Sequence, residues 1–426
     1  MVTPVKFIEY KHHLVVENSK LITRKFICLL MSDGTLRFTN FHRYAKNPNR
    51  KLKHISENSH NRISFINQML NYAFFHRGLC RLSDITPDII CDFLNDFGRV
   101  TLPGDDQYKH RQKGTVLRCL NVILDFFELY LEENKNANFK VDDLFTYVER
   151  RNDHGKIYKT KVPRFEITYT KTDKAIFRDL PNKVFEVVFS HIMTHHPELL
   201  ALISLSAFAG LRPSESCNVR RPDSPLGPGI IFTEIDGKVI KAEIDLREIK
   251  PLRSDLKPLG GIKKKRMQRV PDIFLEAFVD SYNTYMKYMN GHKYEKEYGA
   301  LTVNKQGKAY TYDSYRNKFR KILKNEIIPI LLKDEDPEIA LYGRILLENN
   351  LTPHVFRHWY TVQLVLSGIS EPGILMKLRG DSNPESSLHY IQDKSDLEKQ
   401  FRKVSNNAFD DLYAKAEYRK EKEKND

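Results

Sequence analysis

The sequence predicts a mainly α-helical protein that also contains a small antiparallel β-sheet. Apolar residues recur at helical spacing in two long stretches, within residues 63–74 and 116–131. Apolar and polar residues alternate at 239–244, and a basic stretch then leads to Val270-Pro271, a pattern typical of strands joined by a turn. The chain therefore combines helical modules with a short sheet.

Capping and breaking residues mark where individual helices begin and end. Thr86-Pro87-Asp88 predicts a helix start, with threonine as the N-cap and proline at the first helical position. Gly210 is expected to end a helix over 198–209, and Pro213 to begin the next one. Further helices are expected over residues 184–195, 272–290, 312–333 and 335–350.

The composition favours a nucleic-acid partner and argues against a membrane protein. The 426 residues include 69 Lys and Arg against 55 Asp and Glu, a net charge of +14, which favours binding to a phosphate backbone. The longest apolar stretch, 199–210, is too short to cross a bilayer, so we expect a cytoplasmic protein. Five widely separated cysteines predict a reducing compartment and no zinc site; they are Cys28, Cys80, Cys91, Cys119 and Cys217.

A histidine, two arginines and a late tyrosine form the most informative set of residues: Arg212, His354, Arg357 and Tyr390. The planar guanidinium of arginine matches the non-bridging oxygens of a phosphodiester with two parallel hydrogen bonds. A tyrosine hydroxyl becomes a nucleophile when a base or positive charge lies nearby, because its ordinary pKa is about 10. His354 and Arg357, three residues apart on an expected helix, share one face. These residues predict attack on a phosphodiester without a metal or other cofactor.

In this order and context the residues resemble the motifs of the tyrosine recombinase (phage integrase) family. Gly210-Leu211-Arg212 followed by Glu215 is similar to the first arginine motif, and His354-Val355-Phe356-Arg357 to the His-x-x-Arg motif. A lysine before a Val-Pro pair is also typical of the family. Lys263 stands eight residues before Pro271, and Lys264 and Lys265 remain alternatives.

The last motif departs from the family at one position. Leu378-Arg379-Gly380-Asp381 is followed nine residues later by Tyr390, but Asp381 stands where the family usually has histidine or tryptophan. A carboxylate close to a phosphate is repelled, by about 4 kcal/mol for unit charges 4 Å apart at an effective dielectric of 20. Either Asp381 orients a cation such as Arg357 or His354, or a neighbour such as Asn383 or His389 donates in its place.

The resemblance implies a division of the chain into a helical core-binding domain and a mixed α/β catalytic domain. The expected segments are a β-containing segment of unclear role, a core-binding DNA-binding domain, a basic linker, a catalytic domain and a charged tail. Their ranges are 1–57, 58–148, 149–176, 177–415 and 416–426.

The resemblance also implies roles for the site residues. Arg212 and Arg357 bind the scissile phosphate, Tyr390 attacks it to form a 3′-phosphotyrosyl bond, and Lys263 protonates the leaving 5′ oxygen. His354 manages the tyrosine proton, Asp381 belongs to the site, and Glu215 orients an arginine or the histidine. No cofactor and no metal are expected at this site.

The implied partner is double-stranded DNA, bound by a homo-oligomer, a synaptic tetramer, with accessory DNA-bending proteins and an association with the nucleoid. The implied activity is the integration or excision of a mobile element, and the sequence does not separate it from transposition or dimer resolution. Two alternatives remain: a catalytically silent DNA-binding regulator and a type IB topoisomerase. Each site residue also has a purely structural explanation, such as a salt bridge, a hydrogen bond in the core or packing. Tyr360, close to the His-x-x-Arg motif, is easily mistaken for the nucleophile.

Overall fold

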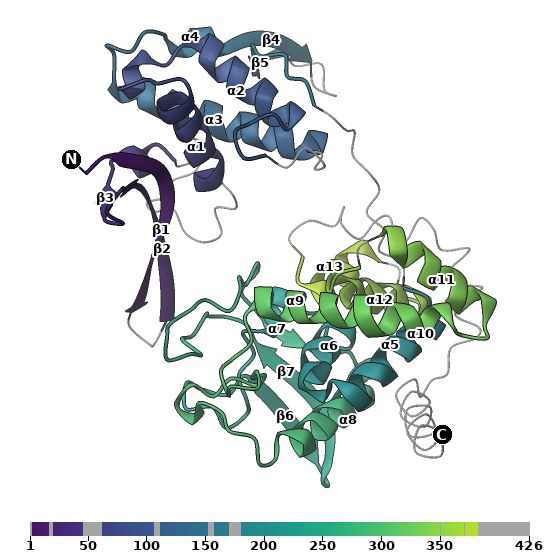
Figure 1. The fold of residues 1–426 in the computed structure, drawn as a ribbon. Coiled ribbons are helices and arrows are strands. Elements are labelled where there is room, and N and C mark those ends of the chain that lie inside the picture. The colour runs from purple at the N-terminus through teal and green to yellow at the C-terminus, as the bar shows by residue number, and fades with distance from the viewer. Residues whose placement is uncertain are drawn as a thin grey trace. The chain divides into compact units, whose positions relative to one another are not determined.

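The computed structural model describes eight segments of the chain, which fold as two compact units. Unit one comprises residues 1–14 and 22–175, and unit two comprises residues 15–21 and 176–426. Figure 1 labels their helices and strands. The described residues are 2–16, 20–45, 62–105, 111–151, 157–169, 180–349, 351–369 and 371–381. Tyr390, Asn383, His389 and the expected charged tail 416–426 lie outside them.

The described N-terminal residues form a three-stranded sheet. The strand order is β1-β2-β3, and β2 pairs with β3 in an antiparallel register that sets Leu29 opposite Arg37. The strands are β1 (Pro4–Val16), β2 (Lys20–Met31) and β3 (Leu36–Phe38), followed by the short helix η2 (Phe41–Arg43).

The rest of unit one is a helical module with its own core. Helix α2 begins as predicted, because the side chain of Thr86 accepts a hydrogen bond from the backbone N–H of Ile89 and Pro87 is the first helical residue. The largest buried side chains of this core include Phe93, Phe126 and Phe127. Its helices are α1 (Arg62–Asn71), η3 (Tyr72–His76), η4 (Leu82–Asp84), α2 (Pro87–Arg99), α3 (Lys113–Glu133) and α4 (Val141–Leu144).

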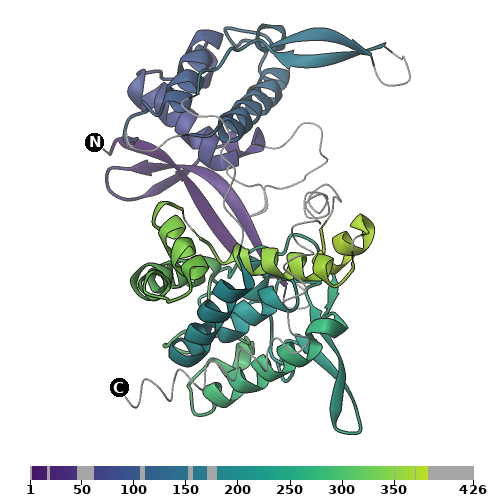
Figure 2. The same ribbon diagram turned by 90° about the vertical axis from the view of Figure 1, so that its right-hand side faces the viewer.

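The first part of the segment expected to be a basic linker lies in a β-hairpin that was not predicted. Strand β4 (Phe145–Arg151) pairs with β5 (Ile157–Pro163) in an antiparallel register. Figure 2 shows this hairpin extending beyond the helices of unit one. The prediction weighed the charges of this segment and overlooked the β-branched and aromatic residues that favour strands.

Unit two carries most of the helices and a second three-stranded sheet, of order β6-β7-β8, that is antiparallel throughout. The alternation predicted at 239–244 is confirmed in β7, where Ala242 and Ile244 are buried. Its elements are α5 (Asn182–His195), η5 (Pro197–Leu199), α6 (Leu200–Ala207), α7 (Pro213–Ser216), β6 (Ile230–Ile235), β7 (Lys238–Asp245), β8 (Met267–Arg269), α8 (Asp272–Met289), η6 (Lys296–Tyr298), α9 (Tyr312–Ile322), η7 (Leu323–Ile327), α10 (Ile328–Leu332), α11 (Pro337–Glu348), α12 (His354–Leu366) and α13 (Pro372–Arg379). The expected fold class, mainly α with small antiparallel sheets, is confirmed.

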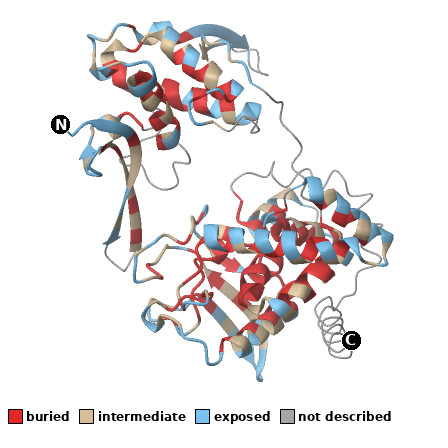
Figure 3. Ribbon diagram, viewed as in Figure 1, coloured by how far each residue is buried: buried red, intermediate tan, exposed pale blue. Residues whose placement is uncertain are grey.

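Helix α6 forms the centre of unit two. All eight of its residues are buried, and Figure 3 shows it among the most enclosed parts of the unit. An aromatic stack nearby joins α5 to α12: the rings of Phe185 and Trp359 lie 3.9 Å apart and nearly parallel, at 8°. Trp359 also donates a hydrogen bond from Nε1 to the side chain of Asn182, 2.8 Å away. The helix that carries Arg357 is therefore fixed by packing. Among the described helices, none combines the length and apolar character needed to cross a membrane.

Replacement of Phe185 by alanine removes one half of this stack. Because Phe185 is almost fully buried, we expect the Phe185→Ala substitution to lower the free energy of unfolding by about 3–5 kcal/mol. Denaturant unfolding followed by circular dichroism measures the change. The matched control is Leu347→Ala, on the exposed side of α11, which should change the free energy by less than about 0.5 kcal/mol. Equal losses in the two variants would contradict the importance of the stack.

Candidate functional site

The tight turn after α6 places Arg212. Gly210 adopts a left-handed conformation, with φ at +65°, and lies against Tyr360, so that a Cβ atom there would come within 2.4 Å of the aromatic ring. The helix expected over 198–209 ends at Ala207, two residues earlier than predicted, and α7 begins at Pro213 as predicted. Glu215 caps the N-terminus of α7, since its Oε2 accepts a hydrogen bond of 3.1 Å from the backbone N–H of Arg212.

Glu215 is fully buried and organises the cations around it. Its carboxylate accepts a hydrogen bond of 3.0 Å from Nη1 of Arg212 and another of 3.0 Å from Nη2 of Arg266. The backbone N–H of Lys263 also donates to it, at 3.3 Å. Burial acts to raise the pKa of Glu215, but the hydrogen bond and charge of Arg266 and the charges of Arg212 and Arg357 outweigh burial and lower it. Glu215 is therefore ionised at neutral pH.

Arg357 reaches the same place from the first turn of α12. Its side chain is buried, and Nη1 donates a hydrogen bond to the backbone carbonyl of Gly210. Burial and the neighbouring guanidinium groups of Arg212 and Arg379 lower the pKa of Arg357 to about 9, while Asp381 and Glu215 act in the opposite direction. Arg357 remains protonated at neutral pH.

Asp381 lies between the arginines. Its Oδ1 accepts hydrogen bonds from Nη2 of Arg212 and from Nη2 of Arg357, the latter at 2.9 Å, and its Oδ2 accepts one of 2.7 Å from Nε of Arg379. The backbone delivers it there because Gly380 ends α13 in a left-handed conformation. Burial acts to raise the pKa of Asp381, but the charges of Arg357, Arg379 and Arg212 outweigh it, and the pKa is lowered. The contact with Arg357 is the one expected if Asp381 orients a cation; Asn383 and His389, the residues of the other alternative, lie outside the described residues.

The cluster holds more positive than negative charge. Four arginines, Arg212, Arg266, Arg357 and Arg379, surround two carboxylates, Glu215 and Asp381, which leaves an excess of two positive charges. Both carboxylates are almost fully buried. Charges in a low-dielectric interior interact more strongly than in water, so a further anion next to Arg212 and Arg357 would be attracted.

The lysine positions differ in how they meet this cluster. Lys264 donates a hydrogen bond of 3.2 Å from Nζ to the backbone carbonyl of Asp381. Lys263 is hydrogen bonded through its backbone to Glu215, and its side chain is exposed. Lys264 and Lys265 are exposed as well. The geometry therefore favours Lys264, one of the two alternatives to Lys263, as the ammonium beside the cluster.

Of the two remaining predicted site residues, the structure describes His354 but not Tyr390. His354 is the first residue of α12 and is exposed, one helical turn before the buried Arg357. Tyr390 lies outside the described residues, so its position relative to the arginines stays a prediction. Tyr360 is fully buried, its hydroxyl donates to the carbonyl of Leu378 at 3.3 Å, and burial raises its pKa. A buried phenol with a raised pKa is a packing residue.

Arg266 and Arg379 belong to the cluster but were not predicted from the sequence. Each lies inside a motif that was examined for another residue, Arg266 in the basic run after Lys263 and Arg379 beside Asp381. Arg379 also donates a hydrogen bond of 2.8 Å from Nη1 to the hydroxyl of Thr361 on α12. The signal that was available is Asp381 itself, because a buried carboxylate requires cationic partners.

The sequence matches no protein-family profile and no curated protein. In structure the chain resembles tyrosine recombinases. The XerH site-specific recombinase bound to difH substrate is 14% identical, with 77% of this chain and 74% of that chain covered, at a TM-score of 0.42. A variant of the Tn1549 transposon integrase with circular intermediate DNA is 15% identical, with coverage of 84% and 98%, at a TM-score of 0.48. A lambda integrase dimer bound to a COC′ core site is 14% identical, with coverage of 80% and 90%, at a TM-score of 0.40. At identities of 14–15% the similarity concerns the fold alone.

The lowered pKa of Asp381 predicts how acid affects stability. A carboxyl group whose folded pKa lies below its unfolded value of 3.8 stabilises the protein above that value and loses this effect as the pH falls through the folded pKa. We expect Asp381→Asn to lower the free energy of unfolding by about 3 kcal/mol at pH 7, because it leaves buried cations unpaired. We also expect this difference from wild type to shrink below pH 4.

Urea unfolding at pH 7, 5, 4 and 3 measures both effects. The control is Asp272→Asn, which removes an exposed carboxylate from a surface ion pair with Arg269 and should leave the acid profile unchanged. A difference between Asp381→Asn and wild type that stays constant from pH 7 to pH 3 would show that the Asp381 charge does not stabilise the fold.

Proposed function

We propose that the chain is a site-specific DNA recombinase that cleaves and rejoins DNA through a phosphotyrosyl intermediate. One observation carries the proposal: Arg212 and Arg357, from distant parts of the sequence, meet at one carboxylate in a buried cluster with excess positive charge. Fixed guanidinium groups facing one acceptor suit a phosphodiester, whose non-bridging oxygens accept paired hydrogen bonds.

Asp381 acts in this proposal as an internal counterion. Its Oδ1 accepts from both Arg212 and Arg357, as a phosphate oxygen would, and it keeps the two side chains in place when DNA is absent. Binding of the scissile phosphate shifts the carboxylate away from Arg212 and Arg357 while its Oδ2 stays paired with Arg379. Glu215 continues to hold Arg212 and Arg266 throughout.

The proposed reaction is a transesterification in two steps. The hydroxyl oxygen of Tyr390 attacks phosphorus, a new bond forms between tyrosine and the 3′ phosphate, and the bond from phosphorus to the 5′ oxygen breaks. His354 accepts the tyrosine proton, and a lysine of the 263–265 run protonates the leaving 5′ oxygen. A 5′ hydroxyl of a partner strand reverses the step, because the phosphotyrosyl bond retains the energy of the broken ester. Arg212 and Arg357 stabilise the extra charge of the transition state.

The proposed partner is double-stranded DNA, held by unit one as a core-binding domain and by unit two as a catalytic domain. Exposed basic residues of the β4–β5 hairpin, Arg150, Arg151 and Lys159, supply phosphate contacts. Strand exchange requires two duplexes, so the proposal includes a homo-oligomer on DNA and a cytoplasmic, nucleoid-associated location. The proposed activity is the integration or excision of a mobile DNA element.

Recovery of covalent adducts tests the proposal directly. The full chain is expressed with total cellular DNA, the mixture is denatured rapidly in detergent, and the DNA that stays linked to protein is sequenced. We expect adducts at a few recurrent sequences with the wild-type chain and none with Tyr390→Phe, which lacks the nucleophilic oxygen. Tyr360→Phe serves as the matched control and should retain adducts, because its hydroxyl is buried.

The outcomes of this adduct experiment distinguish a recombinase from a type IB topoisomerase and from a silent DNA-binding regulator. Adducts scattered without a preferred sequence, together with relaxation of any plasmid, would indicate a type IB topoisomerase. Specific DNA binding without adducts would support a second candidate, a silent DNA-binding regulator. That candidate is favoured by one observation, the ion pairs that Asp381 already forms with Arg212 and Arg357.

The lysine assignment gives a further prediction. If Lys264 protonates the leaving oxygen, Lys264→Ala should slow cleavage by a factor of about 100 or more, and Lys263→Ala should have the smaller effect. A DNA substrate with sulfur in place of the 5′ bridging oxygen should restore the rate of Lys264→Ala, because a thiolate leaves without a proton. The exposed Lys257→Ala is the control. Rescue of Lys263→Ala instead would assign the role to Lys263.

A further inference from the structure

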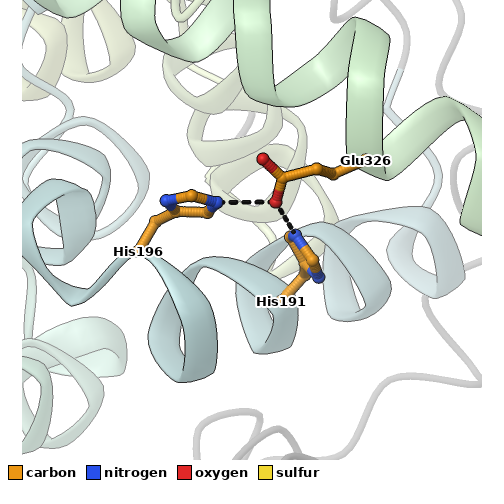
Figure 4. A group of neighbouring side chains, drawn as sticks. All are labelled: His191, His196 and Glu326. Carbon is orange, nitrogen blue, oxygen red and sulfur yellow. Dashed lines mark hydrogen bonds and ion pairs between the residues drawn. The ribbon is translucent and has the colours of Figure 1, made fainter.

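Two histidines and a glutamate of unit two converge away from the arginine cluster. His191 Nε2 lies 2.9 Å and His196 Nε2 lies 2.7 Å from the same oxygen, Oε2 of Glu326. Figure 4 shows both imidazole rings pointing at this one carboxylate oxygen from the end of α5, while Glu326 reaches them from the opposite helix. Among the described residues these are the three potential ligand side chains that gather within 4.8 Å of one another.

The backbone that presents these residues is specialised on both sides. His191 lies on α5, and His196 is the residue at which α5 ends, so the two imidazoles approach from different directions. Glu326 belongs to η7, a π-helical turn in which the backbone N–H of Ile328 bonds to the carbonyl of Leu323, five residues back. Pro329 follows in α10 and has no N–H to donate. Such single π turns occur frequently at functional sites.

We propose that His191, His196 and Glu326 bind one divalent transition-metal ion, with Zn²⁺ the best match. Two imidazole nitrogens and one carboxylate oxygen form a common zinc ligand set, with bonds of about 2.0–2.2 Å and a fourth position for water. The three ligand atoms already lie close together, and a small separation of the side chains makes room for the ion. The side chain of Glu326 is 38% exposed, which gives an ion a path from solvent.

The second nitrogen of His196 supports this assignment. His196 Nδ1 lies 3.7 Å from Oε1 of Glu198, a buried carboxylate whose charge is matched by Lys318. A histidine that binds a metal through one nitrogen generally donates from the other to a carboxylate or carbonyl. Glu198 stands where such a carboxylate partner of His196 is expected.

The proposed ion goes beyond the recombinase function and does not depend on it. It would join the end of α5 to the π-helical turn between α9 and α10 and so act on the stability of unit two. None of its ligands belongs to the arginine cluster. The absence of a zinc site was inferred from widely spaced cysteines, and that argument did not consider histidine and glutamate ligands far apart in the sequence.

Cobalt titration of the full-length chain, prepared without a histidine tag and stripped with EDTA, tests the proposal. We expect one equivalent of Co²⁺ to give the visible absorption of a four-coordinate ion, and Zn²⁺ to displace it. We also expect Zn²⁺ to raise the midpoint of thermal unfolding by several degrees. Circular dichroism confirms that each metal-free variant is folded.

Matched variants decide whether these residues are the ligands. Glu326→Gln keeps an oxygen that accepts from both histidines but removes the charge, and it should weaken Co²⁺ binding about tenfold or more. His191→Gln should do the same, whereas His292→Gln, outside the cluster, should bind like wild type. If His191→Gln fails to fold, Glu326→Gln alone decides. Absence of one-to-one binding in wild type, or unchanged affinity in Glu326→Gln, would overturn the proposal.

Discussion

The ion cluster of Asp381 with Arg212, Arg357 and Arg379 is the interaction on which the centre of unit two depends. Three separate parts of the chain meet there: the turn after α6, the first turn of α12 and the residues that follow α13. Buried charges lose their hydration, and this loss is offset where each charge has close partners and its remaining donors are satisfied. Arg357 meets this condition through Asp381 and the carbonyl of Gly210.

The same constraint explains why the surrounding backbone is shaped as it is. Gly210 has to leave room for Tyr360 so that its carbonyl can face Arg357, and Gly380 has to turn sharply so that Asp381 can face the arginines. Glu215 balances the charge on the other side of Arg212. The site is therefore assembled by pairs of opposite charge within the core, before any ligand is considered.

Much of the fold could be predicted from the sequence because it depends on local patterns. The start of α2 at Thr86, the end of α6 before Gly210 and the strand β7 follow from capping, from a glycine with positive φ and from alternation. The β4–β5 hairpin was missed because its charges suggested a solvated linker, although its Thr, Tyr and Val residues favour strands.

The candidate site was predictable where motifs carried it, and much less so where contacts between distant residues did. Arg212, Glu215 and Arg357 follow from local motifs, whereas the pairing of Arg266 with Glu215 and of Arg379 with Asp381 requires the folded chain. The convergence of His191, His196 and Glu326 is of the same kind, since nothing in the spacing of the two histidines indicates a glutamate on a later helix.

The position of the single tryptophan gives the chain an optical reporter of its own. Trp359 follows Arg357 by two residues on α12 and lies flat on Phe185, so its emission depends on the packing of the helix that carries Arg357. No other indole contributes to the signal, because the chain has one tryptophan. Movements of α12 are thus visible in the intrinsic fluorescence of the unlabelled protein.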